Sequence, residues 1–195
     1  MANLSTRNQI LIGLVLATLM AVTRGQHMLA LAHMPGASAA VFFIAGLYLR
    51  SRFAFPLLLV EAVAIDYAAI QFTAVSNFCI SPAYVALLPA YGALWLAGRW
   101  YAKRMQFRVD TLVPLVASVA VGGIACELIS SGSFYVFSGR FPNPTLAGFA
   151  SRLAQYLPQS LEALALYVGL AAVTHVILTL AHRTPQTRAQ LGESL

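Results

Sequence analysis

Charged side chains are scarce in this sequence. Of its 195 residues, 9% are Asp, Glu, Lys or Arg and 59% are hydrophobic, whereas a soluble domain carries about 25% charged residues. So few charges cannot cover the surface of a soluble globule, and we predict an integral membrane protein. The length predicts a single domain over residues 1–195.

Several motifs are also missing. The sequence contains no ATP-binding motif, no internal repeat and no compact set of metal ligands at a standard spacing. Its formal net charge of +6 suits nucleic acid only if the basic residues share one stripe. They lie instead at the ends of apolar segments, so we predict no nucleic-acid binding.

Long apolar segments are what the sequence has in abundance. A transmembrane helix needs about 20 mostly apolar residues, and a window of that length predicts six such helices. The expected fold is therefore an all-α membrane protein with six transmembrane helices. The predicted helices are Asn8–Thr23, Ala37–Leu49, Phe53–Val75, Pro82–Trp100, Thr111–Ser131 and Pro158–His182.

The basic residues predict the orientation of these helices. If both termini lie on one side, nine Lys and Arg residues gather there and only Arg24, Arg140 and Arg152 lie opposite. Cytoplasmic loops carry such an excess, so we predict that both termini are cytoplasmic. The nine are Arg7, Arg50, Arg52, Arg99, Lys103, Arg104, Arg108, Arg183 and Arg188.

Three connections then face outward: residues 25–36, 76–81 and 132–158. The last is rich in Gly, Pro, Ser and aromatic residues, which predicts an ordered lid or re-entrant loop followed by a short interfacial helix over 145–157. We expect its aromatic loop residues to close over a ligand. These residues are Phe134, Tyr135, Phe137 and Phe141.

The second outward connection, within the polar stretch Ser76–Tyr84, contains Cys79. Three interpretations of this thiol stay open. It is an inert buried group, a disulfide partner of Cys126, or a soft ligand to a metal centre. Polar neighbours favour the ligand, because a thiol used only for packing gains nothing from lying among Asn, Ser and Pro.

The first outward connection contains His27 and His33, each next to a methionine. Imidazole, thioether and thiolate groups on one side of a membrane suit a transition metal. The spacing matches no compact ligand motif, and the alternative is that each histidine is solvated or caps a helix.

Ionisable residues also lie inside the predicted helices, where they are costly and mark a pathway or a paired interior. Asp66 lies about two helical turns below the polar stretch, where it suits a place beneath a ligand. For the other acidic residues the alternative is a hydrogen-bonded carboxyl that holds helices together. The group comprises Glu61, Asp66, Glu127, Glu162 and His175.

Small residues recur at Gly13, Ala17 and Ala21 in the first predicted helix. A spacing of four residues places them on one face, where another helix can approach closely. This face is either an internal seam of the bundle or a docking ridge for a partner protein.

Taken together, the six-helix layout, the small residues Ala17 and Ala21, and Asp66 with the SNFCISPAY stretch resemble the substrate-binding S-components of energy-coupling factor transporters. More closely, the chain resembles the BtuM family, small solitary cobalamin transporters of Gram-negative bacteria. The resemblance covers essentially the whole chain.

The resemblance implies cobalamin uptake across the bacterial inner membrane from a pocket open to the periplasm. It implies that Cys79 ligates the corrin cobalt and that His27, Asp66 and Tyr84 are polar members of the site. In multi-subunit relatives the small-residue ridge docks on a coupling protein driven by two ATPases. Because this chain has no ATP-binding motif, any energy from ATP for uptake would come from partner proteins.

Thiolate donation to cobalt suggests an ancillary enzymatic role, the removal of cyanide from cyanocobalamin. Two alternative functions stay open. One is an S-component for another vitamin, which needs no metal ligand. The other is a membrane enzyme in which Cys79 and an intramembrane carboxylate, from Glu61, Asp66 or Glu127, act in one cavity.

Overall fold

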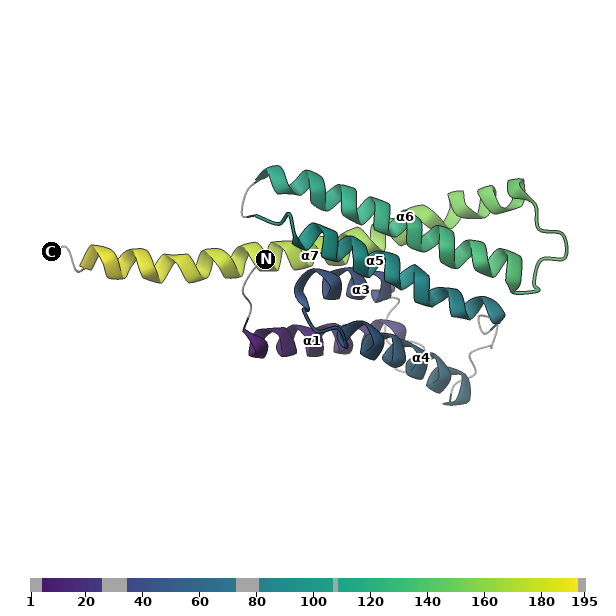
Figure 1. The fold of residues 1–195 in the computed structure, drawn as a ribbon, viewed down its shortest axis with the longest axis horizontal. Coiled ribbons are helices and arrows are strands. Elements are labelled where there is room, and N and C mark those ends of the chain that lie inside the picture. Colours follow the sequence, from purple (N-terminus) through teal and green to yellow (C-terminus); the bar gives the residue numbers. More distant parts are fainter. Residues whose placement is uncertain (1–4, 26–34, 73–80, 107–108, 193–195) are drawn as a thin grey trace.

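The computed structural model describes residues 5–25, 35–72, 81–106 and 109–192. Within these ranges the chain forms helices and no strands, which confirms the all-α prediction (Figure 1). Short 3₁₀ turns, η2 (Pro82–Ala86) and η3 (Val109–Thr111), precede two of the helices. The α-helices are α1 (Thr6–Arg24), α3 (Ser38–Tyr48), α4 (Ala54–Phe72), α5 (Leu87–Ala102), α6 (Leu112–Phe137) and α7 (Leu146–Gly192).

Four helices are long and apolar enough to cross a membrane: α1, α4, α6 and the 146–181 part of α7. Their length and composition indicate a helical membrane protein. Helix α3 has 11 residues and α5 has 16, which is shorter than a bilayer normally requires. Each of the six predicted segments overlaps one of these helices, and six complete spans remain a proposal.

Helix α3 forms the centre of the bundle. Its residues 40–46 are all buried, as expected for a helix that is apolar on every face. It packs most extensively against α5 and also contacts α1, α4 and α7. Glycine allows the two central backbones to meet, because a Cβ atom at Gly98 would overlap the Phe43 carbonyl oxygen and one at Gly46 would overlap the Trp95 carbonyl oxygen.

This close approach predicts that Gly98→Ala destabilises the protein. The added methyl group meets backbone, which cannot rotate away, so we expect a loss of about 1–3 kcal/mol in unfolding free energy. Gly92→Ala in the same helix is the matched control, since a Cβ atom there has no neighbour within 4 Å. Unfolding in detergent measures both, and equal stability of the two variants would contradict the packing described.

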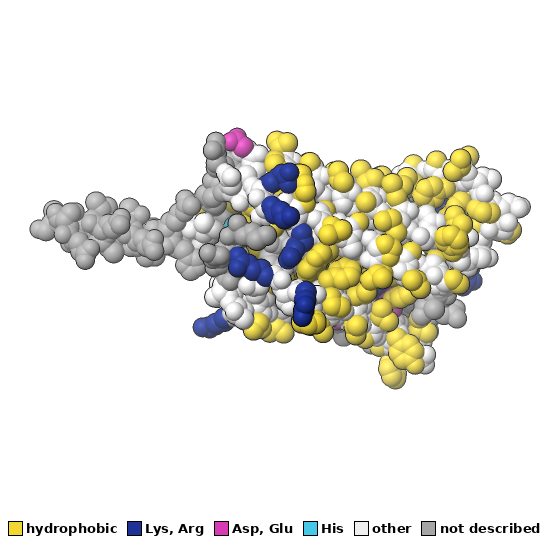
Figure 2. Space-filling model, viewed as in Figure 1, with side chains coloured by type: hydrophobic (Ala, Val, Ile, Leu, Met, Phe, Trp, Pro, Cys, Tyr) yellow, Lys and Arg dark blue, Asp and Glu magenta, His cyan; other side chains and the backbone are white. Residues whose placement is uncertain are grey.

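The basic residues gather at one end of the bundle, where α7 leaves it (Figure 2). Two hydrogen bonds tie the elements together there: Arg50 N–H donates to Gln9 Oε1, and Arg99 Nη1 donates to the Leu49 carbonyl, each over 3.0 Å. Arg24 closes the other end of α1. This distribution agrees with the predicted grouping of charges, and which end is cytoplasmic belongs to the proposal below.

The outward connection after α6 differs from the prediction. Helix α6 continues to Phe137, so Phe134, Tyr135 and Phe137 lie on a helix rather than in a loop. Their apolar side chains continue the helical pattern until Gly139, whose φ of 70° suits glycine. Only Phe141 lies in the connection, where its ring packs against Tyr135 at 4.6 Å between centroids.

The predicted break between residues 157 and 158 is also wrong. Helix α7 runs without interruption from Leu146 to Gly192 and includes Pro158. Tertiary packing and an otherwise apolar sequence therefore outweigh the backbone hydrogen bond that proline removes. The interfacial helix and the sixth predicted helix are one element.

The small-residue face of α1 lies partly against the bundle. A Cβ atom at Gly13 would lie 3.9 Å from Leu49, and Ala17 packs against the buried core. The exposed face of α1 carries larger side chains, including Leu14 and Val15. Gly13 and Ala17 thus contribute to internal packing, and a docking role stays a proposal.

Candidate ligand-binding site

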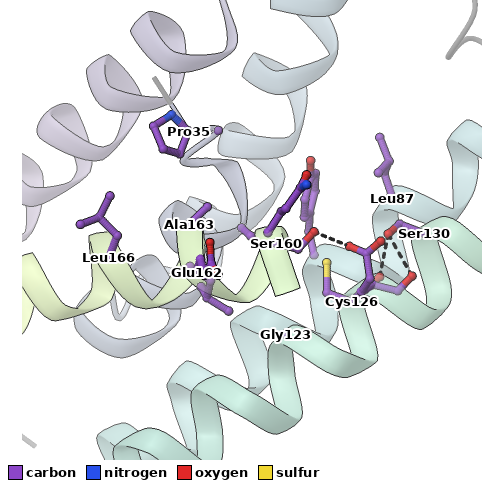
Figure 3. Close-up of a pocket in the computed structure, with 15 residues that line it drawn as sticks. Pro35, Leu87, Gly123, Cys126, Ser130, Ser160, Glu162, Ala163 and Leu166 are labelled. Atoms are coloured by element: carbon purple, nitrogen blue, oxygen red, sulfur yellow. Dashed lines mark hydrogen bonds between the residues drawn. The ribbon is translucent and has the colours of Figure 1, made fainter. Parts of the chain in front are cut away.

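A cavity of about 790 Å³ lies where the start of α3, the start of α5, the middle of α6 and α7 meet (Figure 3). Its volume is in the range of small-molecule sites. The lining residues are Pro35, Gly36, Ala39, Leu87, Tyr91, Gly123, Cys126, Glu127, Ser130, Gln159, Ser160, Glu162, Ala163, Leu164 and Leu166.

The polar wall of this cavity is built around Glu127 of α6. Ser131 donates a short hydrogen bond to Glu127 Oε1, and Ser160 of α7 donates to Oε2 over 2.8 Å. Ser130 donates to the Cys126 carbonyl oxygen over 2.8 Å. Glu127 therefore joins α6 to α7 and holds a carboxyl group at the cavity wall.

Other lining residues are apolar or aromatic. Tyr91 of α5 is held by stacking on Phe42, with ring centroids 4.2 Å apart and planes 11° apart. Leu87 lies one turn earlier on α5, and Ala39 lies near the start of α3. A mostly apolar lining with a few polar groups is the usual form of a ligand site, in which the polar groups orient the ligand.

An ion pair lies next to this cavity. Arg24 Nε and Nη2 donate to the two carboxylate oxygens of Asp66, each over 2.5 Å. Such bidentate pairs are among the strongest hydrogen-bonded contacts in proteins. Their side chains are 16% and 24% exposed, respectively, so each charge needs the other in this apolar bundle.

Three hydroxyl groups complete the ion-pair cluster. Tyr84 Oη donates to Asp66 Oδ2 over 2.7 Å. Arg24 Nη1 donates to Ser38 Oγ and to Tyr91 Oη, both over 3.0 Å. Because Tyr91 also lines the cavity, the ion-pair cluster borders the ligand space directly.

Two of the predicted site residues meet in this cluster. Asp66 comes from α4 and Tyr84 from η2, and their hydrogen bond joins elements that are 18 residues apart. The other two, His27 and Cys79, lie outside the described residues, as does His33. Cobalt ligation by Cys79 stays a prediction.

The remaining candidates separate into cavity residues and others. Glu127 and Glu162 line the cavity, whereas Glu61 is a half-buried residue of α4 that does not. His175 packs beside Tyr48, with ring centroids 5.7 Å apart. Cys126 has a buried side chain at the cavity, and its proposed disulfide partner Cys79 lies outside the described residues.

No group of three or more His, Cys, Asp or Glu residues that could hold a metal ion occurs within the described ranges. This part of the chain therefore offers no resident metal centre. The metal that the resemblance implies would arrive inside the ligand.

Sequence reasoning missed the role of Arg24, which it treated only as an outward charge. A signal was present, because an Arg and an Asp within two apolar helices each need a partner. The partner was unpredictable, since 42 residues separate Arg24 from Asp66. The partnership of Glu127 with Ser160 was missed for the same reason, with 33 residues between them.

Comparison of the chain with protein-family models gives no match, and comparison with curated proteins gives none either. We therefore infer function from the chemistry of the cavity and the ion-pair cluster, together with the family resemblance.

Proposed function

We propose that the protein binds cobalamin in this cavity and mediates its uptake across the bacterial inner membrane. The observation that carries the proposal is the hydrogen bond from Tyr84 to Asp66 beside the cavity. The resemblance to the BtuM family names both residues as members of one site, and they are in contact although they belong to different elements.

The orientation of the bundle supports the proposal. The ion-pair cluster lies at the end of α1 opposite the basic end. With the basic end in the cytoplasm, as the positive-inside rule favours, the cluster and the cavity face the periplasm. Six spans with both termini in the cytoplasm complete this arrangement.

The cavity suits one part of a corrin. A corrin ring has apolar faces and an edge that carries amide groups, and the cavity combines Tyr91 and Leu87 with a polar wall around Glu127. Tyr135 of α6 and Phe141 of the following connection pack against each other, and neither is among the described residues that line the cavity.

Cobalt is the ligand's own metal, and Cys79 is proposed as the residue that binds it. Cys79 precedes Ser81, the N-cap residue of η2, by two positions in the sequence, and η2 carries Tyr84. A thiolate is a strong donor to a transition metal. Its donation also supports displacement of cyanide, which would leave with its electron pair as the sulfur–cobalt bond forms.

Energy for uptake comes from outside the chain in this proposal. The sequence has no ATP-binding motif, so accumulation requires either trapping of cobalamin inside the cell or a coupling module. The proposed contact for a module is the face of α1 that contains Gly13, Ala17 and Ala21.

Uptake tests the proposal in a Gram-negative strain whose own inner-membrane cobalamin importer is deleted. Cells that express the protein are expected to accumulate radiolabelled cyanocobalamin above the level of cells with an empty vector. Cells that express Cys79→Ala at equal membrane abundance should stay near the vector level. The proposal fails if wild-type protein is present in the membrane and accumulation does not exceed the vector control.

A further inference from the structure

The serine hydroxyl groups of the polar wall donate their hydrogen bonds to groups within the protein. Ser130 donates to the Cys126 carbonyl oxygen, and Ser160 donates to Glu127. A hydroxyl group has one proton to donate and two lone pairs to accept with. Both serine oxygens can therefore act only as acceptors toward a ligand in the cavity.

Glu127 adds acceptors to the same wall. An ionised carboxylate offers about four lone-pair positions and no proton, and the structure assigns one hydrogen bond to each oxygen of Glu127, from Ser131 and Ser160. At least one position on each oxygen stays available. The wall thus offers a ligand hydrogen-bond acceptors from three residues, Ser130, Ser160 and Glu127.

The acidic and basic side chains among the described residues that line the cavity are all acidic. Glu127 and Glu162 line it, and no Lys, Arg or His is among the described lining residues. Arg24 is the cation nearest in the hydrogen-bond network, and it is committed to Asp66. Among the described lining side chains, the Gln159 amide can donate, and so can the Tyr91 hydroxyl, which accepts from Arg24 and keeps its proton. The wall around Glu127 therefore favours ligand groups that donate hydrogen bonds and repels anions.

We propose that Glu127 determines specificity by accepting a hydrogen bond from a primary carboxamide on the corrin edge. A carboxamide NH₂ group supplies two donors, whereas the carboxylate left by its hydrolysis supplies none and repels Glu127. The cavity thereby selects fully amidated corrinoids over forms with a free carboxylate. This inference rests on the proposed function, because it concerns the same cavity and the same ligand class.

A site built to hydrogen-bond a ligand group rejects the analogue that lacks it, because its own polar groups are left unpaired. Rejection reaches about 10⁴-fold in fully enclosed sites. Glu127 is half-buried, so water moderates the effect, and we expect at least about a tenfold preference.

The test is calorimetric titration of the purified full-length protein with cyanocobalamin and with each of its three singly hydrolysed monocarboxylic acids. Wild-type protein is expected to bind at least one of these acids at least about tenfold more weakly than cyanocobalamin. In Glu127→Gln the amide can donate to a carboxylate, and the preference should fall to within about threefold. Glu61→Gln is the control, since this carboxyl lies outside the cavity, and it should keep the wild-type preference.

The ratio of affinities separates selectivity from a purely structural role. If Glu127 only joins α6 to α7, Glu127→Gln lowers stability and weakens all four ligands equally, and the inference is wrong. Equal binding of all four ligands by wild-type protein also overturns it while the proposed function stands. No binding of cyanocobalamin by wild-type protein overturns both. If Glu127→Gln does not fold, the same titrations are made with Glu162→Gln. An unchanged preference for cyanocobalamin over its monocarboxylic acids in that variant contradicts the proposal that acidic residues of the cavity select the ligand.

Discussion

Replacement of Cys79 by alanine is expected to abolish the change in the visible absorption spectrum that cobalamin undergoes on binding. The proposed bond joins the Cys79 sulfur to cobalt, and the visible spectrum of a corrin reports its axial ligands. Loss of outer-shell partners already weakens metal binding by about 10–100-fold, so loss of the ligand itself should cost at least about 100-fold in affinity. Titration of purified protein, followed by absorption and calorimetry, measures both quantities.

Cys126→Ala is the matched control for this prediction. Cys126 lines the cavity, and its side chain is buried. It belongs to the middle of α6, whereas Cys79 belongs to the polar stretch before η2. Cys126→Ala should keep the spectral change. If the spectral change survives in Cys79→Ala and disappears in Cys126→Ala, the cobalt ligand is Cys126 and the prediction for Cys79 is wrong.

The second large effect is expected for Asp66→Asn. This change leaves the Arg24 charge unpaired in an apolar bundle, where its side chain is only 16% exposed. Removal of one partner of a buried pair costs about 3–5 kcal/mol, and partial exposure of Asp66 places our expectation near the lower limit. Chemical or thermal unfolding in detergent measures the loss. Tyr84→Phe removes only one hydrogen bond to Asp66 and should cost about 1 kcal/mol.

A double variant distinguishes an unpaired charge from a loss of packing. Arg24→Met with Asp66→Leu removes both charges, and apolar replacement of a buried ion pair is often neutral for stability. We expect this variant to recover most of the stability that Asp66→Asn loses. Because it lacks the proposed site residue Asp66, we expect it to bind cobalamin more weakly than the wild-type protein. Wild-type stability in Asp66→Asn would show that Arg24 does not depend on Asp66.

Helix positions were predictable because apolar length and the small number of charges are local properties of the sequence. The end of α6 was not, since aromatic residues mixed with Gly and Ser are found in loops and in helices alike. Helix α6 ends at Phe137, and Gly139, two residues later, has a positive φ angle that is not helical. The continuity of α7 through Pro158 was also hidden, because packing against α6 and α3 supports it.

The candidate site was predictable only in part, for a related reason. Asp66 and Tyr84 were accessible through the resemblance and through the cost of an acidic residue inside an apolar helix. Glu127 was recognised as costly, but its partner Ser160 depends on how α6 meets α7. Arg24 was the largest omission, because its charge indicates that it needs a partner but nothing in the sequence indicates which residue, 42 positions away, supplies it.

The most direct test of the account is a titration of the purified wild-type protein with a panel of vitamins: cobalamin, riboflavin, thiamine and biotin. The account predicts saturable binding of cobalamin with a change in its visible spectrum, and no binding of the other three. Saturable binding of another vitamin in place of cobalamin would contradict the account, and so would the absence of cobalamin binding by folded protein.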